Sequence, residues 1–217
     1  MIASANKKTF KHIAIALCVC LSWPLIAQLD ITDAVLDRIE KEHNAYARER
    51  VVSWQSLIAD SRNLPEQEKL RTVNDFFNSN VQFINDQALW GKEDYWATPI
   101  EMLSVGAGDC EDYSIAKYFT LKQLGVSEEK LRITYVKAVE IGQAHMVLTY
   151  FETKRSVPLV LDNLVTDIKP ANQRKDLVPV YSFNGAGLWL AKARGGGKRV
   201  GDSSRLSLWE DLSQRMK

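Results

Sequence analysis

The sequence predicts an α+β fold in which N-terminal helices pack on an antiparallel sheet. Apolar residues recur at helical spacing through the first half of the 217-residue chain, whereas later segments are rich in Val, Tyr and Thr and suit strands. Helices followed by strands are typical of α+β domains. Neither an internal repeat nor a linker divides the chain, so we expect residues 28–217 to form a single domain with its own core.

Three helices are expected before the sheet. Residues 29–61 form the first, because apolar residues recur there at helical spacing with charged residues between them. Pro65 suits the first position of the second helix, whereas residues 78–98, rich in Asn, Asp and aromatic residues, are expected to be a loop. The third helix covers residues 110–124, and Gly125 ends it.

Five later segments predict strands of one antiparallel sheet. They are residues 131–139, 144–151, 159–164, 178–183 and 188–191. The run Gly-Gly-Gly-Lys-Arg at residues 195–199 lacks the spacing of a phosphate-binding loop. We interpret it as a mobile basic surface segment.

Residues 1–27 have the pattern of a secretory signal peptide. Three lysines make the start positive, residues 13–21 are apolar, and Ala27 suits cleavage. The apolar run is shorter than the roughly 20 residues of a membrane span, and an uncleaved anchor is the alternative. We therefore expect export, with the periplasm as the location.

Removal of the signal leaves Cys110 as the single cysteine, because Cys18 and Cys20 lie within the removed segment. Neither of those two follows the small residue that a lipidated cysteine needs. A lone thiol in an oxidising compartment cannot form an internal disulfide, so Cys110 is either a small buried hydrophobe or a nucleophile. Without the signal the chain has 25 basic residues (28 − 3) against 27 acidic ones, a balance of −2, and no nucleic-acid partner is expected.

Cys110, His145 and Asp162 can form a catalytic triad. Cys110 follows a glycine-rich turn and begins the third expected helix, whose N-terminal N–H groups stabilise a thiolate and can hold an oxyanion. His145 lies on the second expected strand and Asp162 near the end of the third, and neighbouring antiparallel strands can bring the two together. The alternatives without a catalytic role are that His145 is a hydrogen-bonded structural residue of the core and that Asp162 caps a turn.

Asp109, Glu111 and Asp112 surround Cys110, although nearby carboxylates disfavour a thiolate. Two explanations are open at this point. The acids cap the helix N-terminus, where negative charge is favourable, or they bind a cation that cancels their charge. Oxygen ligands suit Ca²⁺, whereas too few Cys and His are present for a zinc site outside the triad.

The segments Tyr-Trp-Ala-Thr-Pro at residues 95–99 and Gly-Asp-Cys-Glu-Asp-Tyr-Ser-Ile-Ala-Lys-Tyr at residues 108–118 resemble the bacterial transglutaminase-like cysteine proteinases. Residues 143–148 and 161–163 fit the His and Asp blocks of that family. The resemblance implies a papain-like, transglutaminase-like α+β fold. It also implies that Cys110 is a nucleophile at a helix N-terminus, with His145 as the base and Asp162 as the orienting acid.

The same resemblance implies calcium dependence, with Asp109, Glu111 and Asp112 as ligands. Backbone carbonyls or acids of residues 85–94 are candidates for the remaining ligands, which the sequence does not identify. The implied activity is that of a periplasmic endopeptidase that cleaves the N-terminal region of a large surface adhesin at a di-alanine site, which promotes biofilm dispersal. An inner-membrane receptor for cyclic di-GMP is the implied inhibitory partner.

Three alternative functions use or retain the same residues. A transglutaminase would pass the acyl group to an amine instead of water. An arylamine acetyltransferase-type enzyme would need acetyl-coenzyme A, which is cytoplasmic, so the export signal argues against it. A non-catalytic calcium-binding adaptor would keep the fold without needing an intact Cys, His and Asp.

Overall fold

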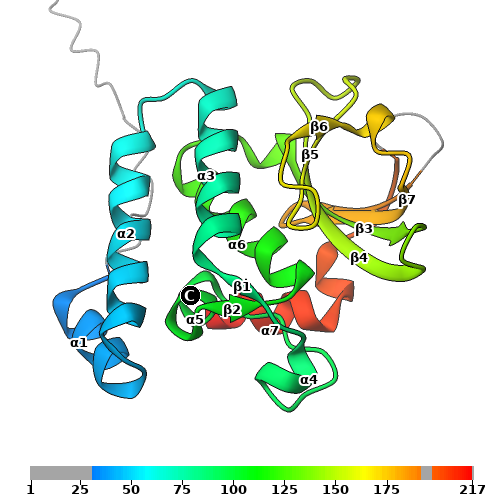
Figure 1. Cartoon of the computed structure of the whole chain (residues 1–217). Helices are drawn as coiled ribbons and strands as arrows, with labels where there is room; N and C mark the ends of the chain where they lie inside the picture. The colour runs from blue at the N-terminus through cyan, green and yellow to red at the C-terminus, as the bar shows by residue number, and fades with distance from the viewer. Residues whose placement is uncertain (1–30, 192–196, 217) are drawn as a thin grey trace, which may run out of the picture.

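The computed structural model describes residues 31–191 and 197–216, which form a helical part beside a curled sheet (Figure 1). The signal segment expected at residues 1–27 lies outside the described residues. Within the described residues, no helix is both long and apolar enough to cross a membrane. The helices are α1 (Asp33–Glu42), α2 (Ala45–Ser61), α3 (Glu66–Asn80), α4 (Asp86–Leu89), α5 (Pro99–Val105), α6 (Cys110–Gln123) and α7 (Ser207–Arg215).

The sheet confirms the predicted antiparallel arrangement. Seven strands lie in the order β6-β5-β4-β3-β7-β8-β9, and every neighbouring pair is antiparallel. Five of them match the predicted segments, whereas the short strands β6 and β9 were not predicted. The strands are β3 (Leu131–Ala138), β4 (Gln143–Tyr150), β5 (Leu159–Leu161), β6 (Lys169–Pro170), β7 (Leu177–Asn184), β8 (Gly187–Leu190) and β9 (Lys198–Gly201).

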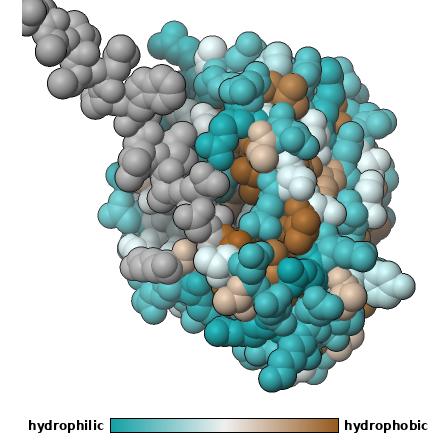
Figure 2. Space-filling view, turned by 90° about the vertical axis from the view of Figure 1, so that its left-hand side faces the viewer, coloured by the Kyte–Doolittle hydropathy of each residue, from teal (hydrophilic) through white to brown (hydrophobic). Residues whose placement is uncertain are grey.

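The prediction of one helix over residues 29–61 is wrong, because the chain breaks between α1 and α2. Asn44 is extended at the break, and its side chain accepts a hydrogen bond from the Ala47 N–H at 3.0 Å. This N-cap satisfies a donor that would otherwise lack a partner, so it favours a new helix start over continuation. Figure 2 shows the face of the molecule on which α1 and α2 lie. Hydrophilic residues predominate on this face, with small apolar patches between them.

Helix α6 is the element that joins the helical part to the sheet. It contacts β4 and β3 on one side and α3 on the other. Ile115 and Leu121 of α6 are fully buried in one cluster with Ile133 of β3 and Leu148 of β4. Burial of each such side chain stabilises the fold by about 1.5–3 kcal/mol. Helix α6 is therefore held against the sheet.

The C-terminal segment closes the lower end of the core (Figure 1). Trp209 of α7 stacks on Phe119 at 5.8 Å and meets Phe183 edge-on at 5.2 Å. The predicted mobile basic loop at residues 195–199 is corrected in part, because Lys198 and Arg199 belong to β9, whereas residues 195 and 196 lie outside the described residues.

Candidate active site

Two glycines allow the tight path that leads into α6. Gly106 ends α5 in a left-handed conformation with φ of 74°, where an added Cβ would lie 2.7 Å from the Arg50 guanidinium carbon. At Gly108, a Cβ would lie 2.7 Å from a carboxylate oxygen of Asp112. Strand β2 (Ala107–Gly108), which includes the second glycine, pairs with β1 (Gln82–Phe83). The close packing of this segment sets where Cys110 begins the helix.

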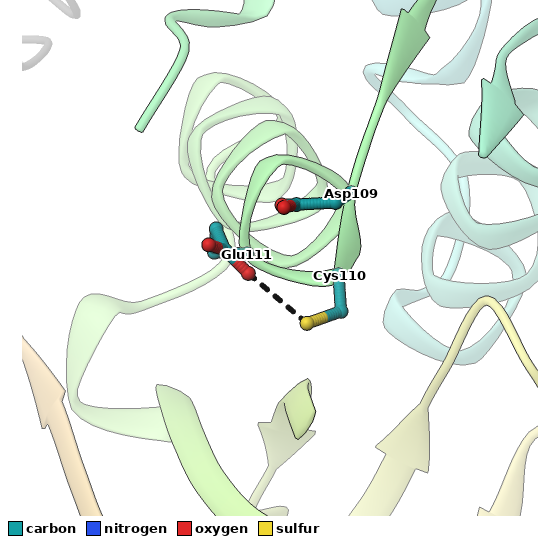
Figure 3. A group of neighbouring side chains, drawn as sticks. All are labelled: Asp109, Cys110 and Glu111. Carbon is teal, nitrogen blue, oxygen red and sulfur yellow. Dashed lines mark hydrogen bonds between the residues drawn. The ribbon is translucent and has the colours of Figure 1, made fainter. Parts of the chain in front are cut away.

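The Cys110 thiol lies between the start of α6 and strand β4. Its sulfur donates to a Glu111 carboxylate oxygen at 3.0 Å (Figure 3). It also accepts a hydrogen bond from the backbone N–H of Met146, which follows His145 in β4. Burial, and then the charges of Glu111 and Asp109, raise the pKa of the thiol above its ordinary value. The thiol thus needs a base or a compensating positive charge to become a nucleophile.

His145 and Asp162 form a buried pair on neighbouring strands. His145 Nε2 lies 2.8 Å from Asp162 Oδ1, which also accepts a hydrogen bond from the Leu164 N–H at 3.0 Å. Arg174 Nη2 donates to Asp162 Oδ2 at 2.7 Å. Burial alone would raise the pKa of Asp162, but hydrogen bonds from His145, Leu164 and Arg174 lower it to about 2. An ionised Asp162 requires the proton on His145 Nε2, which leaves Nδ1 as the basic nitrogen.

A buried lysine supports the backbone of Asp162. Lys117 of α6 is fully buried, and its ammonium group donates to the Asn74 and Asn78 side-chain oxygens at 2.9 and 2.8 Å and to the Asp162 carbonyl at 3.0 Å. Three acceptors match the three N–H donors of an ammonium group. The network ties α3 and α6 to the segment after β5 and so helps to place Asp162.

We expect Lys117 to make stability depend on pH. Burial lowers the pKa of Lys117 to about 7 in the folded chain, whereas an unfolded lysine has a pKa near about 10.4. Between these values the unfolded chain binds more protons, so stability rises with pH, by at most about 1.4 kcal/mol per unit. Lys117→Met should remove this slope in urea unfolding measured at pH 7, 8 and 9.

The exposed Lys137 offers a matched control. Lys137→Met should keep the wild-type slope, because an exposed lysine loses little hydration on folding. If the dependence of stability on pH were the same in Lys117→Met and Lys137→Met, the lowered pKa of Lys117 would be contradicted.

Four carboxylates gather beside the thiol. Asp86 and Asp94 precede α5 in sequence, yet one carboxylate oxygen from each lies within 4.8 Å of one from Glu111, and Asp109 lies as close to Asp86. The carboxylates of Asp109 and Glu111 turn toward each other at the start of α6 (Figure 3). This arrangement brings acids of residues 85–94 to the predicted calcium ligands.

The cluster has the chemistry of a cation site. Burial and the neighbouring Glu111 raise the pKa of Asp109 to about 9, and burial raises the pKa values of Glu111, Asp86 and Asp94 as well. Oδ1 of Asp86 and Oδ1 of Asp109 are buried without a hydrogen-bond partner among the described residues. Unpaired carboxylate oxygens are costly unless a cation or proton satisfies them. The donor set contains only hard oxygen ligands, which suit calcium.

Asp112, the third predicted ligand, also serves as a helix cap. It is fully buried and accepts hydrogen bonds from the Ala97 N–H at 2.7 Å and the Asp109 N–H at 3.3 Å. One of its oxygens still lies within 4.8 Å of Asp86 and Asp109. Both explanations for the acids around Cys110 therefore have support, with Asp112 divided between capping and the cluster.

Arg174 and Lys117 were not identified in the sequence. The sequence contains one indication of Lys117, which is the single charged residue in the stretch 113–121. A charge on a helix face that is expected to be buried needs polar partners. Arg174 left no indication, since it lies in a polar segment without helical or strand spacing, twelve residues after Asp162. Its role depends on how the loop after β6 folds back.

The thiol thus lies at a helix N-terminus against the strand that carries His145, and His145 is paired with Asp162. Cysteine-dependent acyl-transfer enzymes use these three residue types. The sequence matches the family described as bacterial transglutaminase-like cysteine proteinase over residues 44–190. The chain belongs to this family, whose members are cysteine proteases.

Solved structures agree with this assignment. The chain is 42% identical to EGTA-treated LapG from Legionella pneumophila, with coverage of 84% of this chain and 97% of that chain and a TM-score of 0.74. It is 41% identical to calcium-bound LapG from the same organism, with coverage of 86% and 100% and a TM-score of 0.73. Comparison with curated proteins found no match.

Proposed function

We propose that the protein is a periplasmic, calcium-dependent cysteine endopeptidase that cleaves a large surface adhesin near its N-terminus at a di-alanine site. The observation that carries the peptidase chemistry is the position of the Cys110 thiol. The thiol accepts a hydrogen bond from the N–H of Met146, the residue that follows His145 in β4. His145 Nε2 is in turn hydrogen-bonded to Asp162. The release of the adhesin and the promotion of biofilm dispersal rest on the family resemblance.

In the first half of the reaction, His145 Nδ1 takes the thiol proton and the Cys110 sulfur attacks the scissile carbonyl carbon. N–H groups at the start of α6 stabilise the oxyanion, because a helix N-terminus carries unpaired donors and partial positive charge. The imidazolium then donates its proton to the leaving amine. Asp162 holds the ring and stabilises its positive charge throughout, since its lowered pKa keeps it ionised.

In the second half, His145 takes a proton from water as the water oxygen attacks the thioester carbonyl carbon. The carbon–sulfur bond then breaks, and the imidazolium returns the proton to the Cys110 thiolate. A transglutaminase would accept an amine at the same step, so the acyl-enzyme does not separate the two outcomes. Mass measurement of the products does: hydrolysis yields two fragments of the substrate, whereas crosslinking yields a heavier species.

Asp86, Asp94, Asp109 and Glu111 would hold calcium in this protein, with a further contact available from Asp112. Bound calcium would supply positive charge that offsets the carboxylates beside the thiol and so favours the thiolate. The structures of calcium-bound and EGTA-treated LapG support this proposal. The unpartnered oxygens of Asp86 and Asp109 support it from this chain itself.

We infer control by an inner-membrane receptor for cyclic di-GMP. The receptor would sequester the protease in the periplasm when the messenger is abundant and free it when the messenger falls. The signal-peptide pattern of residues 1–27 supports export to that compartment. These regulatory steps rest on the resemblance to the family.

The substrate proposal is tested with the N-terminal fragment of a candidate adhesin that contains a di-alanine. We expect two product masses that place the cut at this dipeptide when calcium is present. A fragment in which both alanines are replaced by leucine is the matched control and should stay intact. Cleavage of both fragments at the same rate, or a crosslinked product, would contradict the proposal.

We expect Asp162→Asn to lower the cleavage rate by about 10²–10⁴-fold, because an amide no longer enforces the reactive ring tautomer of His145. Asn retains the shape of Asp, but its one carbonyl oxygen can accept from the Leu164 N–H or from Arg174 and not from both, so we expect a folded variant with a lowered unfolding temperature. Single-turnover cleavage together with thermal unfolding measures both properties. The exposed Asp167 provides a control, and Asp167→Asn should retain the wild-type rate. A wild-type rate for Asp162→Asn would refute its orienting role.

A further inference from the structure

A cavity of about 500 Å³ lies on the face of the sheet opposite α6. Side chains alternate between the faces of a strand, and here Ile133 and Leu148 join the main core below α6. Val136, Val147 and Val160 instead form a separate apolar cluster that lines the cavity. The sheet curls around this side (Figure 1). The volume falls within the about 300–1,000 Å³ of typical small-molecule sites.

The charged residues of the cavity wall have one sign. Arg132, Arg155 and Arg174 line it, and no Asp or Glu occurs among its described lining residues. The rest of the wall is mostly aliphatic. A positive potential in an apolar enclosure favours an anion over a cation or a neutral molecule.

Arg132 is the residue best prepared to meet an anionic head group. Its guanidinium carbon lies 4.0 Å from the ring centroid of Trp189 and 4.9 Å from that of Phe151. Stacking on two aromatic rings restricts the side chain, so binding of an oxyanion loses less conformational entropy. Arg155 is exposed and contributes charge from the loop after β4.

Arg174 belongs both to the cavity wall and to the active site. Its side chain is 4% exposed and donates to Asp162, the partner of His145, at 2.7 Å. Two carboxylates, Asp162 and Asp176, oppose its charge. Its Nη1 has no hydrogen-bond partner among the described residues, so one donor remains available for a new acceptor. A ligand that attracts this guanidinium competes with Asp162 for it.

We propose that this cavity binds a small amphipathic anion, with its apolar body against Val136, Val147 and Val160 and its head group at Arg132. The negative charge brought into the cavity attracts Arg174, which shares the cavity wall, and so weakens the hold of Arg174 on Asp162. The site is separate from the peptide-cleaving thiol. Its ligand class is that of alkyl carboxylates, in which one anionic group ends an aliphatic chain.

Decanoate is the probe, and titration calorimetry on the full chain measures its binding. We expect saturable binding that weakens at least about tenfold in Arg132→Met and several-fold in Arg155→Ala. Arg71 is exposed on α3, outside the cavity wall, so Arg71→Ala is the matched control and should bind as wild type does. Thermal unfolding checks that Arg132→Met is folded, and the exposed Arg155 provides a variant that leaves the core untouched.

Two further ligands separate the features of decanoate that matter. Decyltrimethylammonium has the same chain with a cationic head group, and acetate has the head group without the chain. Neither should bind at concentrations that saturate the site with decanoate. Equal binding of decyltrimethylammonium, or affinity for decanoate that none of the arginine variants changes, would overturn the proposal.

Alkylation of Cys110 by iodoacetamide reports the link to the active site, with peptide mass used to locate the label. We expect saturating decanoate to change the alkylation rate at least about threefold in wild type and not in Arg132→Met. An unchanged rate in wild type with bound decanoate would refute transmission through Arg174. Neither measurement depends on adhesin cleavage, so failure of this proposal is distinguishable from failure of the proposed function.

Discussion

Replacement of Cys110 by alanine should abolish cleavage of the adhesin fragment, with a loss of at least about 10³-fold. The sulfur is the atom that bonds to the scissile carbonyl carbon, so no neighbouring group can replace it. Cys110 is the single cysteine among the described residues, and within them its thiol hydrogen-bonds to Glu111 and to the Met146 N–H. We therefore expect the fold and its unfolding temperature to change little.

Cys110→Ser tests the same point with a smaller change in shape. Serine keeps a hydrogen-bond donor, but its hydroxyl is a far weaker nucleophile than a thiolate, so the variant should be as inactive as Cys110→Ala. A covalent cysteine-protease inhibitor should label wild type at Cys110. Turnover that survives in either variant would end the protease proposal, and a wild-type thiol that resists the inhibitor would favour the non-catalytic adaptor.

Removal of calcium should have an effect of similar size. We expect excess EGTA to stop cleavage and added calcium to restore it. Without a cation, burial and the charges of Glu111 and Asp109 hold the pKa of the Cys110 thiol above its ordinary value, which keeps the sulfur protonated. The double variant Asp109→Asn, Glu111→Gln should be inactive at calcium concentrations that saturate wild type. It lacks two of the charged ligands, and without bound calcium the burial of the thiol still raises its pKa.

Asp86→Asn extends this test to a residue that only the fold brings to the cluster. It should raise the calcium concentration needed for half-maximal activity at least about tenfold, since one anionic ligand is lost. The exposed Glu140 supplies the control, and Glu140→Gln should show the wild-type requirement. Full activity of an Asp109→Ala, Glu111→Ala double variant in excess chelator would contradict the calcium proposal.

The predicted fold and the nucleophile segment could be read because their signals are local. The change from helical to strand spacing lies in the sequence itself, and Gly106, Gly108 and Cys110 lie within five residues of one another. The break at Asn44 was missed for the opposite reason. Apolar spacing continues across it, and a single cap decides that α2 starts afresh.

The calcium ligands show an intermediate case. Asp109 and Glu111 flank the thiol in sequence, so their charge posed a problem that pointed to a cation. Asp86 and Asp94 could be named only as members of a loop, because β1 and α4 must fold against β2, the segment that precedes α6, before the two carboxylates reach Glu111. The spacing of residues along the chain cannot predict which loop carboxylates will contact Glu111, because that contact forms only when the loop folds back.

The sequence alone determined which residue types carry the chemistry: a solitary thiol at a helix start, one strand histidine and a later aspartate. The tertiary structure alone decided what surrounds them. Packing of α6 between α3 and the sheet carries Lys117 to the Asp162 carbonyl, and the loop after β6 carries Arg174 to its carboxylate. The physical reason is separation along the chain: Lys117 and Asp162 meet only after the core has assembled, and no local propensity encodes that meeting.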